Sequence, residues 1–295
     1  MENEKKGIFF AILAALAYAT NAICVKLAIE VPPVSMVFFR NLTCLILLSP
    51  MFFKTKVSYK TIKIKLFSLR ALMSFFGLVC FYFATKHLLL VNAVMLINAS
   101  PLFVPLVILI WDRVKIPAVR VAAIVVGFIG ILFILKPNLS FMNFAGFIGL
   151  LSGIFVSISY VTLKKLSKTE AATKILFYFF AGNTALSFFP MLFELKTFQN
   201  PYTWLYLFLV GVTSFIYQAF TTQAYTFAPA TKVSTISGNL AVVFSGFFAW
   251  GIWGKIPDLW SFIGITLVIM AGITVAVLKQ KPVVEKPVLE KVEND

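Results

Sequence analysis

Long runs of apolar residues fill most of this chain, and short segments with charges or prolines separate them. A helix needs about 20 such residues to cross the hydrocarbon core of a bilayer, where its backbone polar groups must be satisfied within the helix. Ten runs are long enough, at residues 7–29, 34–53, 66–86, 88–111, 118–136, 144–163, 173–193, 202–222, 231–253 and 259–279. The boundary between the eighth and ninth runs, at residues 223–230, is the least clearly marked, because it carries no charge. The pattern predicts an all-α membrane protein with ten transmembrane helices.

The composition excludes a soluble protein. Hydrophobic residues make up 60% of the chain and charged residues 13%, whereas soluble domains carry about 25% charged residues. The net charge of +15 could indicate nucleic-acid binding, but the basic residues lie between the apolar runs, where they orient a membrane protein. The three cysteines lie inside apolar runs, with no metal-ligand or disulfide spacing. We therefore expect a surrounding lipid bilayer, no nucleic-acid partner, no metal and no cofactor.

The distribution of Lys and Arg predicts the orientation. With the N-terminus placed in the cytoplasm, the cytoplasmic segments receive 19 basic residues and the outer segments receive four. Cytoplasmic loops carry such an excess in membrane proteins. We expect a multi-pass protein of the inner (plasma) membrane with both termini in the cytoplasm. Residues 1–6 form a cytoplasmic N-terminus, and residues 280–295, which lack helical periodicity, form a disordered cytoplasmic tail.

Weak internal similarity divides the ten runs into two sets of five. A shift of 140 residues aligns the Lys-Ile-Pro segment 115–117 with the Lys-Ile-Pro segment 255–257. A shift of 139 residues places Lys26 of the first run on Lys165 of the sixth. An odd number of spans per half inserts the halves in opposite directions, which is the inverted-repeat architecture of many secondary transporters. We predict two inverted five-helix repeats at residues 7–136 and 144–279.

Short motifs recur along both halves of the chain. They are Gly7…Ala14-Ala15…Tyr18…Lys26, Pro33…Phe39-Arg40, Arg70, Ala84…Ala93…Pro101 and Gly127…Gly130 in the first half, and Gly146…Tyr160…Lys164, Gly211…Tyr217…Ala224…Ala228 and Gly264…Gly272 in the second. Through them the chain, over residues 7–279, resembles the drug/metabolite transporter superfamily, in its ten-span EamA-domain branch. The resemblance implies a metabolite transporter. That family often places Glu after the fourth and ninth spans; here Asp112 follows the fourth, but Lys255 follows the ninth.

Charged residues near the ends of the runs are the first candidates for binding. Arg40 lies six residues into the second run, which corresponds to about 9 Å of helix. Its planar fork could face a cavity and bind a carboxylate or a phosphate, or it could extend to the outer headgroups. We favour the headgroup interpretation for Lys26 and Lys86, and we interpret Arg70, at the cytoplasmic start of its run, as an orientation charge.

Larger neutral polar groups inside the runs are further candidates, because polar groups are expensive to bury in lipid. They are Tyr18, Asn21, Asn98, Tyr160, Tyr217, Gln218, Ser234 and Asn239. We expect the first, fourth, sixth and ninth helices to line a cavity with them. The alternative, which we favour for any single Ser or Thr, is a hydrogen bond within its own helix or to a neighbour. Pro101 and Pro105 remove helix hydrogen bonds and predict a kink or hinge in the fourth helix.

The sequence predicts a secondary transporter that works by alternating access. Its substrate would be a small organic metabolite: an amino acid or derivative, S-adenosylmethionine, a nucleotide-like compound or a vitamin. No acidic residue lies in the middle of a run, which favours exchange, facilitated movement or coupling through the substrate. An intramembrane enzyme would need paired carboxylates or a metal cluster, a channel needs a ring of identical groups, and a scaffold has no need of polar groups at mid-span. We do not expect an enzyme; a homodimer is compatible with the sequence.

Overall fold

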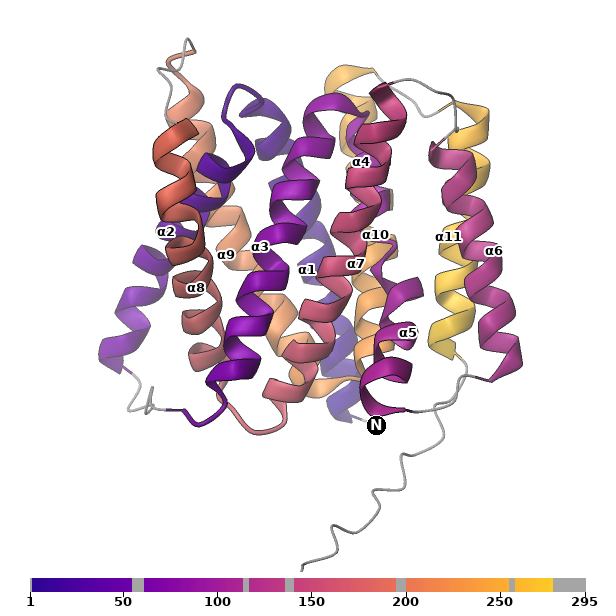
Figure 1. Cartoon of the computed structure of the whole chain (residues 1–295), viewed down its shortest axis with the longest axis horizontal. Coiled ribbons are helices and arrows are strands. Elements are labelled where there is room, and N and C mark those ends of the chain that lie inside the picture. Colours follow the sequence, from indigo (N-terminus) through magenta and orange to yellow (C-terminus); the bar gives the residue numbers. More distant parts are fainter. Residues whose placement is uncertain are drawn as a thin grey trace, which may run out of the picture.

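The computed structural model describes residues 2–54, 61–113, 117–135, 141–194, 200–254 and 258–277. Within these ranges the chain forms eleven helices and no strand, and the helices stand side by side as one bundle (Figure 1). They are α1 (Glu2–Leu27), α2 (Pro33–Lys54), α3 (Ile64–His87), α4 (Leu90–Ile97), α5 (Ser100–Asp112), α6 (Ala118–Leu135), α7 (Phe141–Ser167), α8 (Ala172–Glu194), α9 (Thr203–Phe227), α10 (Ala230–Trp253) and α11 (Leu259–Val277). The predicted all-α class is confirmed.

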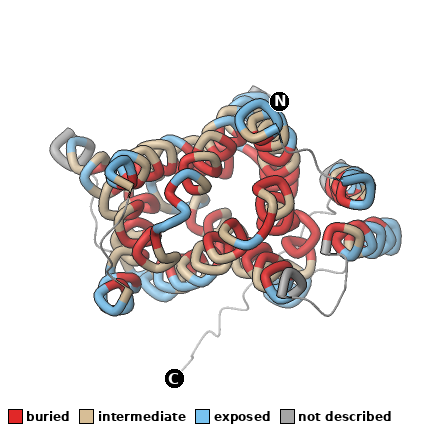
Figure 2. The backbone as a smooth tube through the Cα atoms, turned by 90° about the horizontal axis from the view of Figure 1, so that it is seen from above, coloured by how far each residue is buried: buried red, intermediate tan, exposed pale blue. Residues whose placement is uncertain are grey.

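The helices have the length and composition of membrane spans. Eight segments are long and apolar enough to cross a bilayer when α4 and α5 are counted together, and α6 and α11 are shorter apolar helices. Buried segments face the middle of the bundle and exposed segments face outward (Figure 2). Large apolar side chains lie on the outside, among them Phe193, Ile110 and Phe189, which are 91%, 80% and 70% exposed. Such a surface is stable in lipid and would drive association in water.

The fourth predicted span is a broken helix. Pro101 has no N–H to donate to the carbonyl of Ile97, and its ring clashes with a helical carbonyl at that position. The helix therefore ends at Ile97, and α5 starts again at Ser100. Pro105, the second predicted kink, stays inside α5. The break is a feature of the structure, and a hinge motion at this point stays a prediction.

Two glycines on neighbouring helices allow close packing against this break. A Cβ added to Gly153 of α7 would lie 2.6 Å from the carbonyl oxygen of Leu96. A Cβ added to Gly238 of α10 would lie 3.3 Å from the carbonyl oxygen of Asn98. The backbone at the end of α4 is thus held between α7 and α10, and at Gly153 a larger residue would force the backbone of α4 or α7 to move.

The helices pair in the pattern that an exchange of the two halves would produce. The first span (α1) packs along the eighth (α9), and the third (α3) packs along the sixth (α7). The first span corresponds to the sixth, and the third corresponds to the eighth. Exchange of the two halves therefore converts one of these pairs into the other. The second span (α2) packs on the seventh (α8), and the fifth (α6) packs on the tenth (α11). Helices α6 and α11 stand together at one edge of the bundle (Figure 1). This pattern is consistent with the predicted inverted repeat.

Two lysines at opposite ends of the bundle make equivalent contacts. The Nζ of Lys26, in α1, donates to the carbonyl oxygens of Thr85 and Leu88 at the end of α3. The Nζ of Lys164, in α7, donates to the carbonyls of residues 225 and 228 at the end of α9, at 2.7 and 2.9 Å. The acceptors are related by the predicted shift of 140 residues, but the lysines are related by 138. The predicted alignment of Lys26 with Lys165 is therefore wrong by one residue.

Some predictions fall on residues that the structure does not describe. The Lys-Ile pair 115–116, the Lys-Ile-Pro segment 255–257 and the tail 280–295 lie outside the described residues.

Candidate functional site

A cavity lies inside the bundle, between the first three spans of each half. Its volume is about 30 Å³, and its walls come from α1, α2, α3, α7, α8 and α9. Six of the residues that the sequence predicts for substrate binding line it: Tyr18, Asn21, Arg40, Tyr160, Tyr217 and Gln218. Tyr160 is partly exposed and the other five are buried. Side chains from helices far apart in the sequence therefore converge on one site.

Arg40 is buried in this cavity and does not extend to the headgroups. Its side chain is 1% exposed, and its Nε donates a hydrogen bond of 2.6 Å to Oγ of Ser214, in α9. Its Nη1 is also buried and has no hydrogen-bond partner among the described residues. One edge of the guanidinium is thus fixed by Ser214, and another donor is left for a ligand.

Asn21 of α1 fixes the position of Ser214. Its Nδ2 lies 2.8 Å from Oγ of Ser214, 2.9 Å from Oγ1 of Thr213 and 2.9 Å from the carbonyl oxygen of Val210. Ser214 therefore contacts the amide of Asn21 and the guanidinium of Arg40 together. These contacts join α1, α2 and α9 at the cavity wall.

Arg70 is a second buried cation in the same cavity, which corrects its interpretation as an orientation charge. Its side chain is 2% exposed, because α3 begins at Ile64 and α8 covers the guanidinium. The Nη1 of Arg70 donates to the carbonyl oxygen of Ile175 at 3.2 Å, and its Cζ lies 4.5 Å from the ring centre of Phe179. Its buried Nε has no hydrogen-bond partner among the described residues.

Three tyrosines meet at the centre of the cavity wall. The hydroxyls of Tyr160 and Tyr217 share a hydrogen bond of 2.5 Å. The ring of Tyr18 packs edge-on against the ring of Tyr217, with centroids 5.0 Å apart. The hydroxyl of Tyr18 is buried and has no hydrogen-bond partner in the described part of the chain. The three rings offer an apolar surface together with hydroxyl groups.

The cavity carries positive charge without a protein counter-charge. Arg40 and Arg70 both line it, and no Asp or Glu of the described residues does so. Burying an ion without a counter-charge costs roughly several kcal/mol, even after the protein relaxes around it. An anion that occupied the cavity would compensate this cost and would bind the free donors by charge-assisted hydrogen bonds.

Comparison with known proteins identifies the family of this chain. The EamA-like transporter family matches residues 5–136 and, a second time, residues 143–278. The chain belongs to this family. Family members of known activity carry small molecules across membranes, so this EamA-like protein is a transporter of small metabolites of the drug/metabolite transporter superfamily, as the sequence motifs predict.

The relatives of this EamA-like transporter carry different molecules. It is 28% identical over 281 residues to the pseudopaline exporter CntI of Pseudomonas aeruginosa, which covers 94% of this chain and 98% of that protein. It is 24% identical over 282 residues to an S-adenosylmethionine uptake transporter of Rickettsia felis, with 95% of each covered. It is 22% identical over 276 residues to a riboflavin transporter of Vibrio cholerae, with 90% and 91% covered. The relatives therefore include an exporter and an uptake transporter.

A solved crystal structure has the same fold as this EamA-like transporter. The two superimpose with a TM-score of 0.66 over 91% of this chain and 95% of the other, at 14% sequence identity. At this identity the likeness shows the fold alone.

Three of the residues predicted for substrate binding are not among the described residues of the cavity wall. Asn98, at the end of α4, donates from Nδ2 to the carbonyl of residue 94 at 2.8 Å. Ser234 of α10 donates to the carbonyl of residue 231 at 3.2 Å. Asn239 lies 3.4 Å from the carbonyl oxygen of Ile269, in α11. The fourth and ninth spans, which the sequence analysis expected to line the cavity, add no residue to its described wall.

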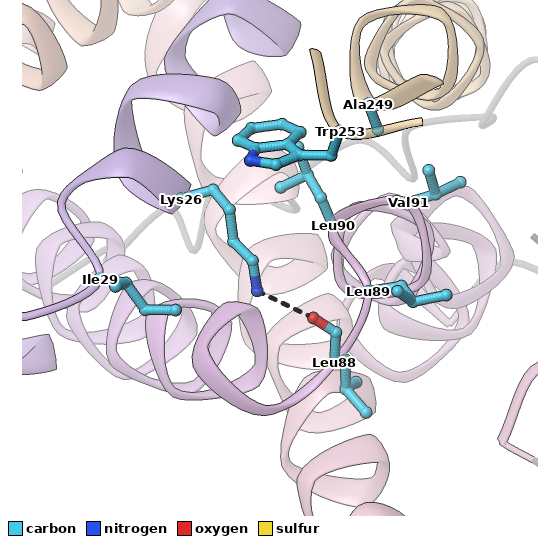
Figure 3. Close-up of a pocket in the computed structure, with 8 residues that line it drawn as sticks. All are labelled: Lys26, Ile29, Leu88, Leu89, Leu90, Val91, Ala249 and Trp253. Carbon is cyan, nitrogen blue, oxygen red and sulfur yellow. Dashed lines mark hydrogen bonds between the residues drawn. The ribbon is translucent and has the colours of Figure 1, made fainter. Parts of the chain in front are cut away.

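The fourth and ninth spans instead line a second cavity beside the end of α1. Its volume is about 230 Å³, and it is lined by Lys26, Ile29, residues 88–91, Ala249 and Trp253 (Figure 3). Lys26 is the one charged residue among the described residues of its wall, and the Lys26 ammonium is bound to the carbonyl of residue 88, 3.1 Å away. This cavity is mainly apolar.

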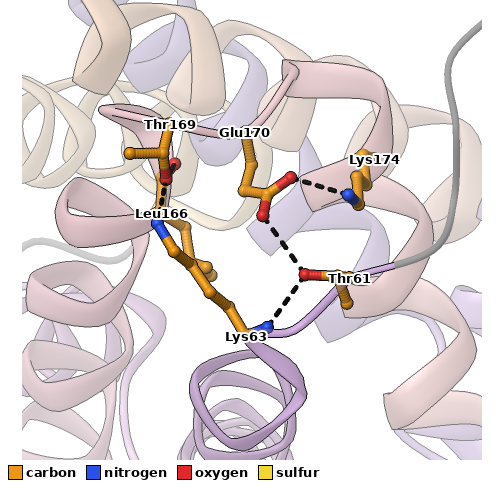
Figure 4. A network of polar contacts seen from close by, with 6 residues as sticks. All are labelled: Thr61, Lys63, Leu166, Thr169, Glu170 and Lys174. Atoms are coloured by element: carbon orange, nitrogen blue, oxygen red, sulfur yellow. Dashed lines mark hydrogen bonds and ion pairs between the residues drawn. The ribbon is translucent and has the colours of Figure 1, made fainter.

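A polar network joins the two connections at the opposite end of the bundle. The carboxylate of Glu170, between α7 and α8, pairs with Nζ of Lys174 at 2.7 Å and accepts a hydrogen bond of 3.2 Å from Oγ1 of Thr61 (Figure 4). Lys63 reaches Oγ1 of Thr169 at 2.6 Å. The hydrogen bond from Lys174 holds the pKa of Glu170 below its usual value. The network lies near Lys164, at the end of α7.

The α3 side of the cavity that contains Arg40 was not predicted from the sequence. Tyr82 and four further residues of α3 line the cavity, and these four share one helical face: Arg70, Ser74, Leu78 and Phe81. Their spacing of four, four and three is that of a single helix face. The polar start of this face, Arg70 with Ser74, is a signal that could have identified it.

Proposed function

We propose that this protein is a secondary transporter for a small organic metabolite that carries an anionic group, a carboxylate or a phosphate. The observation that carries the proposal is the Arg40 guanidinium, which is buried inside the cavity with Nη1 unpaired among the described residues. Arginine binds both anions through two parallel hydrogen bonds. Because Ser214 already orients the Nε edge, the guanidinium is preorganised for binding.

The other wall residues provide groups that suit the remainder of such a molecule. Tyr18, Tyr160 and Tyr217 provide ring surface, and Gln218 provides an amide. These groups suit a metabolite with an apolar part and a polar part, such as an amino acid derivative, a nucleotide-like compound or a vitamin. S-adenosylmethionine is in the predicted range because it carries a carboxylate, but its positive charge would oppose the two arginines.

The position of the cavity between the halves supports transport by alternating access. The proposal is that two inverted five-helix halves, residues 7–136 and 144–279, rock about the cavity in the inner membrane, with both termini in the cytoplasm. The equivalent contacts of Lys26 and Lys164 close opposite ends of the bundle in this scheme. No carboxylate lines the described cavity wall, which supports exchange or facilitated movement over coupling through a buried acid.

Uptake into proteoliposomes tests the proposal. Empty and preloaded vesicles with the purified protein would be supplied with a labelled panel of anionic, neutral and cationic metabolites. We expect saturable uptake of one anionic class, lost in Arg40→Gln and reduced about tenfold or more in Arg40→Lys, because an ammonium cannot form the two parallel bonds.

Arg113 provides the matched control, because its side chain is exposed at the turn after α5. Arg113→Gln and Arg113→Lys should transport like the wild type. Uptake of a cation or a neutral compound that is indifferent to Arg40 would contradict the anionic class. A pore open to both sides at once, detected by paired-cysteine cross-linking at the two ends, would contradict alternating access.

A further inference from the structure

The second arginine of the cavity has no role in the proposal above. Arg70 comes from α3, whereas Arg40 comes from α2, and both guanidinium groups are almost completely buried, with exposures of 2% and 1%. Both line the same cavity. Arginine stays charged in proteins, so the cavity wall holds two positive charges.

Each arginine has one edge bound to the protein and one donor left over. Arg40 is held by Ser214 and has Nη1 free of described partners. Arg70 is held by the carbonyl of Ile175 and the ring of Phe179, and its Nε is free of described partners. The holding groups leave the positive charges uncompensated, because a hydroxyl, a carbonyl and an aromatic ring carry no net charge.

We propose that Arg70 is a second substrate-binding residue and that the transported metabolite carries two negative charges. The two charges can lie on separate anionic groups, as in a dicarboxylate, or on one phosphate monoester. This inference rests on the proposed function, because it places a second charge contact in the same site. A dianion would compensate both buried cations, whereas a monoanion leaves one of them uncompensated in a medium of low dielectric constant.

The two arginines also connect both halves of the bundle through their fixed edges. Arg40 of α2 contacts Ser214 of α9, and Arg70 of α3 contacts Ile175 of α8. A dianion bound to both side chains would therefore be held at contacts between the halves. The affinity for the dianion would depend on the relative position of the two halves, as alternating access requires.

The rival explanation is that Arg70 only fastens α8 to α3. Stability alone does not separate the two explanations, since both predict that a variant unfolds more easily. The charge preference of the ligand separates them, because a purely structural arginine does not distinguish one ligand charge from two.

Ligand binding by the purified full-length protein in detergent is the experiment, followed through its thermal unfolding at neutral pH. The probes are two matched pairs: glutarate with its monoamide, and phenyl phosphate with its methyl ester. Each pair keeps its shape nearly constant and changes the charge from two to one. The first pair represents separate anionic groups and the second represents a phosphate monoester.

We expect the wild type to bind the doubly charged member of at least one pair about tenfold or more tightly, since a charge-assisted hydrogen bond is lost in the other member. Arg70→Gln should lose this preference and keep the binding of the singly charged member. Arg40→Gln should weaken both members, and Arg113→Gln should change neither.

If Arg70→Gln does not fold, Arg70→Lys replaces it. This variant keeps the charge and should keep the preference for two charges while binding the dianion more weakly; unchanged dianion binding would overturn the inference. Equal wild-type affinity for both members of each pair, with both dependent on Arg40, would overturn the role of Arg70 and leave the proposed function intact. Binding of none of the four anions would overturn both.

Discussion

Replacement of Gly153 by alanine tests the close packing of α7 against the broken fourth span. A Cβ at this position would lie 2.6 Å from the carbonyl oxygen of Leu96, and a backbone carbonyl cannot turn away as a flexible side chain can. Overpacking of this kind costs typically about 1–3 kcal/mol. Alanine is also a better helix former than glycine, by roughly 1 kcal/mol, so the expected net change lies between no effect and about 2 kcal/mol of destabilisation.

Gly246 of α10 separates the two contributions. A Cβ added there meets nothing within 4 Å, so Gly246→Ala receives the helix-propensity gain without the clash. We expect the free energies of unfolding of the two variants to differ by about 1–3 kcal/mol, because the helix-propensity gain is common to both and only the clash differs. The assay is denaturant-induced unfolding in detergent, followed by circular dichroism. Equal stability of Gly153→Ala and Gly246→Ala would refute the close approach of α7 to the break.

Two further predictions concern the ends of the bundle. Lys26→Met and Lys164→Met each remove charge-assisted hydrogen bonds to carbonyls at a helix end, and each should lower the free energy of unfolding by about 2 kcal/mol. On a background without native cysteines, reporter cysteines should label faster at the end where the lysine was removed; faster labelling at both ends would contradict separate closures. The second prediction concerns pH. The Lys174 ammonium lowers the pKa of the Glu170 carboxyl from 4.5, so the pair stabilises the fold above the unfolded-state pKa and is lost as the pH falls through the lower folded-state pKa. Glu170→Gln should therefore reduce the loss of stability below about pH 4.5, measured by unfolding across a pH series; an unchanged pH profile would show that the pair contributes nothing.

The spans could be predicted from the sequence because the length of an apolar run depends on the membrane and little on the rest of the protein. The break in the fourth span was also predictable, since the missing N–H of Pro101 acts locally. The predicted boundary at 223–230 lies where the structure separates α9 from α10. These features need no knowledge of how the helices pack.

The walls of the cavity were only partly predictable. Arg40 and Tyr217 could be identified because each lies several residues inside an apolar run, but Arg70 lies near a run end, where a surface position and a buried one give the same pattern. Its burial depends on α8, more than 100 residues further along the chain. The hydrogen bonds that Ser234 and Asn239 make outside the cavity are likewise set by helix packing, which the sequence pattern does not specify.

The central claim is that an anionic metabolite is bound between Arg40 and Arg70. The most direct test is an experimental structure of the protein with the substrate that the uptake assay identifies. We predict that an anionic oxygen lies within about 3 Å of Nη1 of Arg40, and that a second charged oxygen lies at the same distance from Nε of Arg70. A substrate bound instead in the apolar cavity beside Lys26 and Trp253, with both arginines unoccupied, would contradict the account.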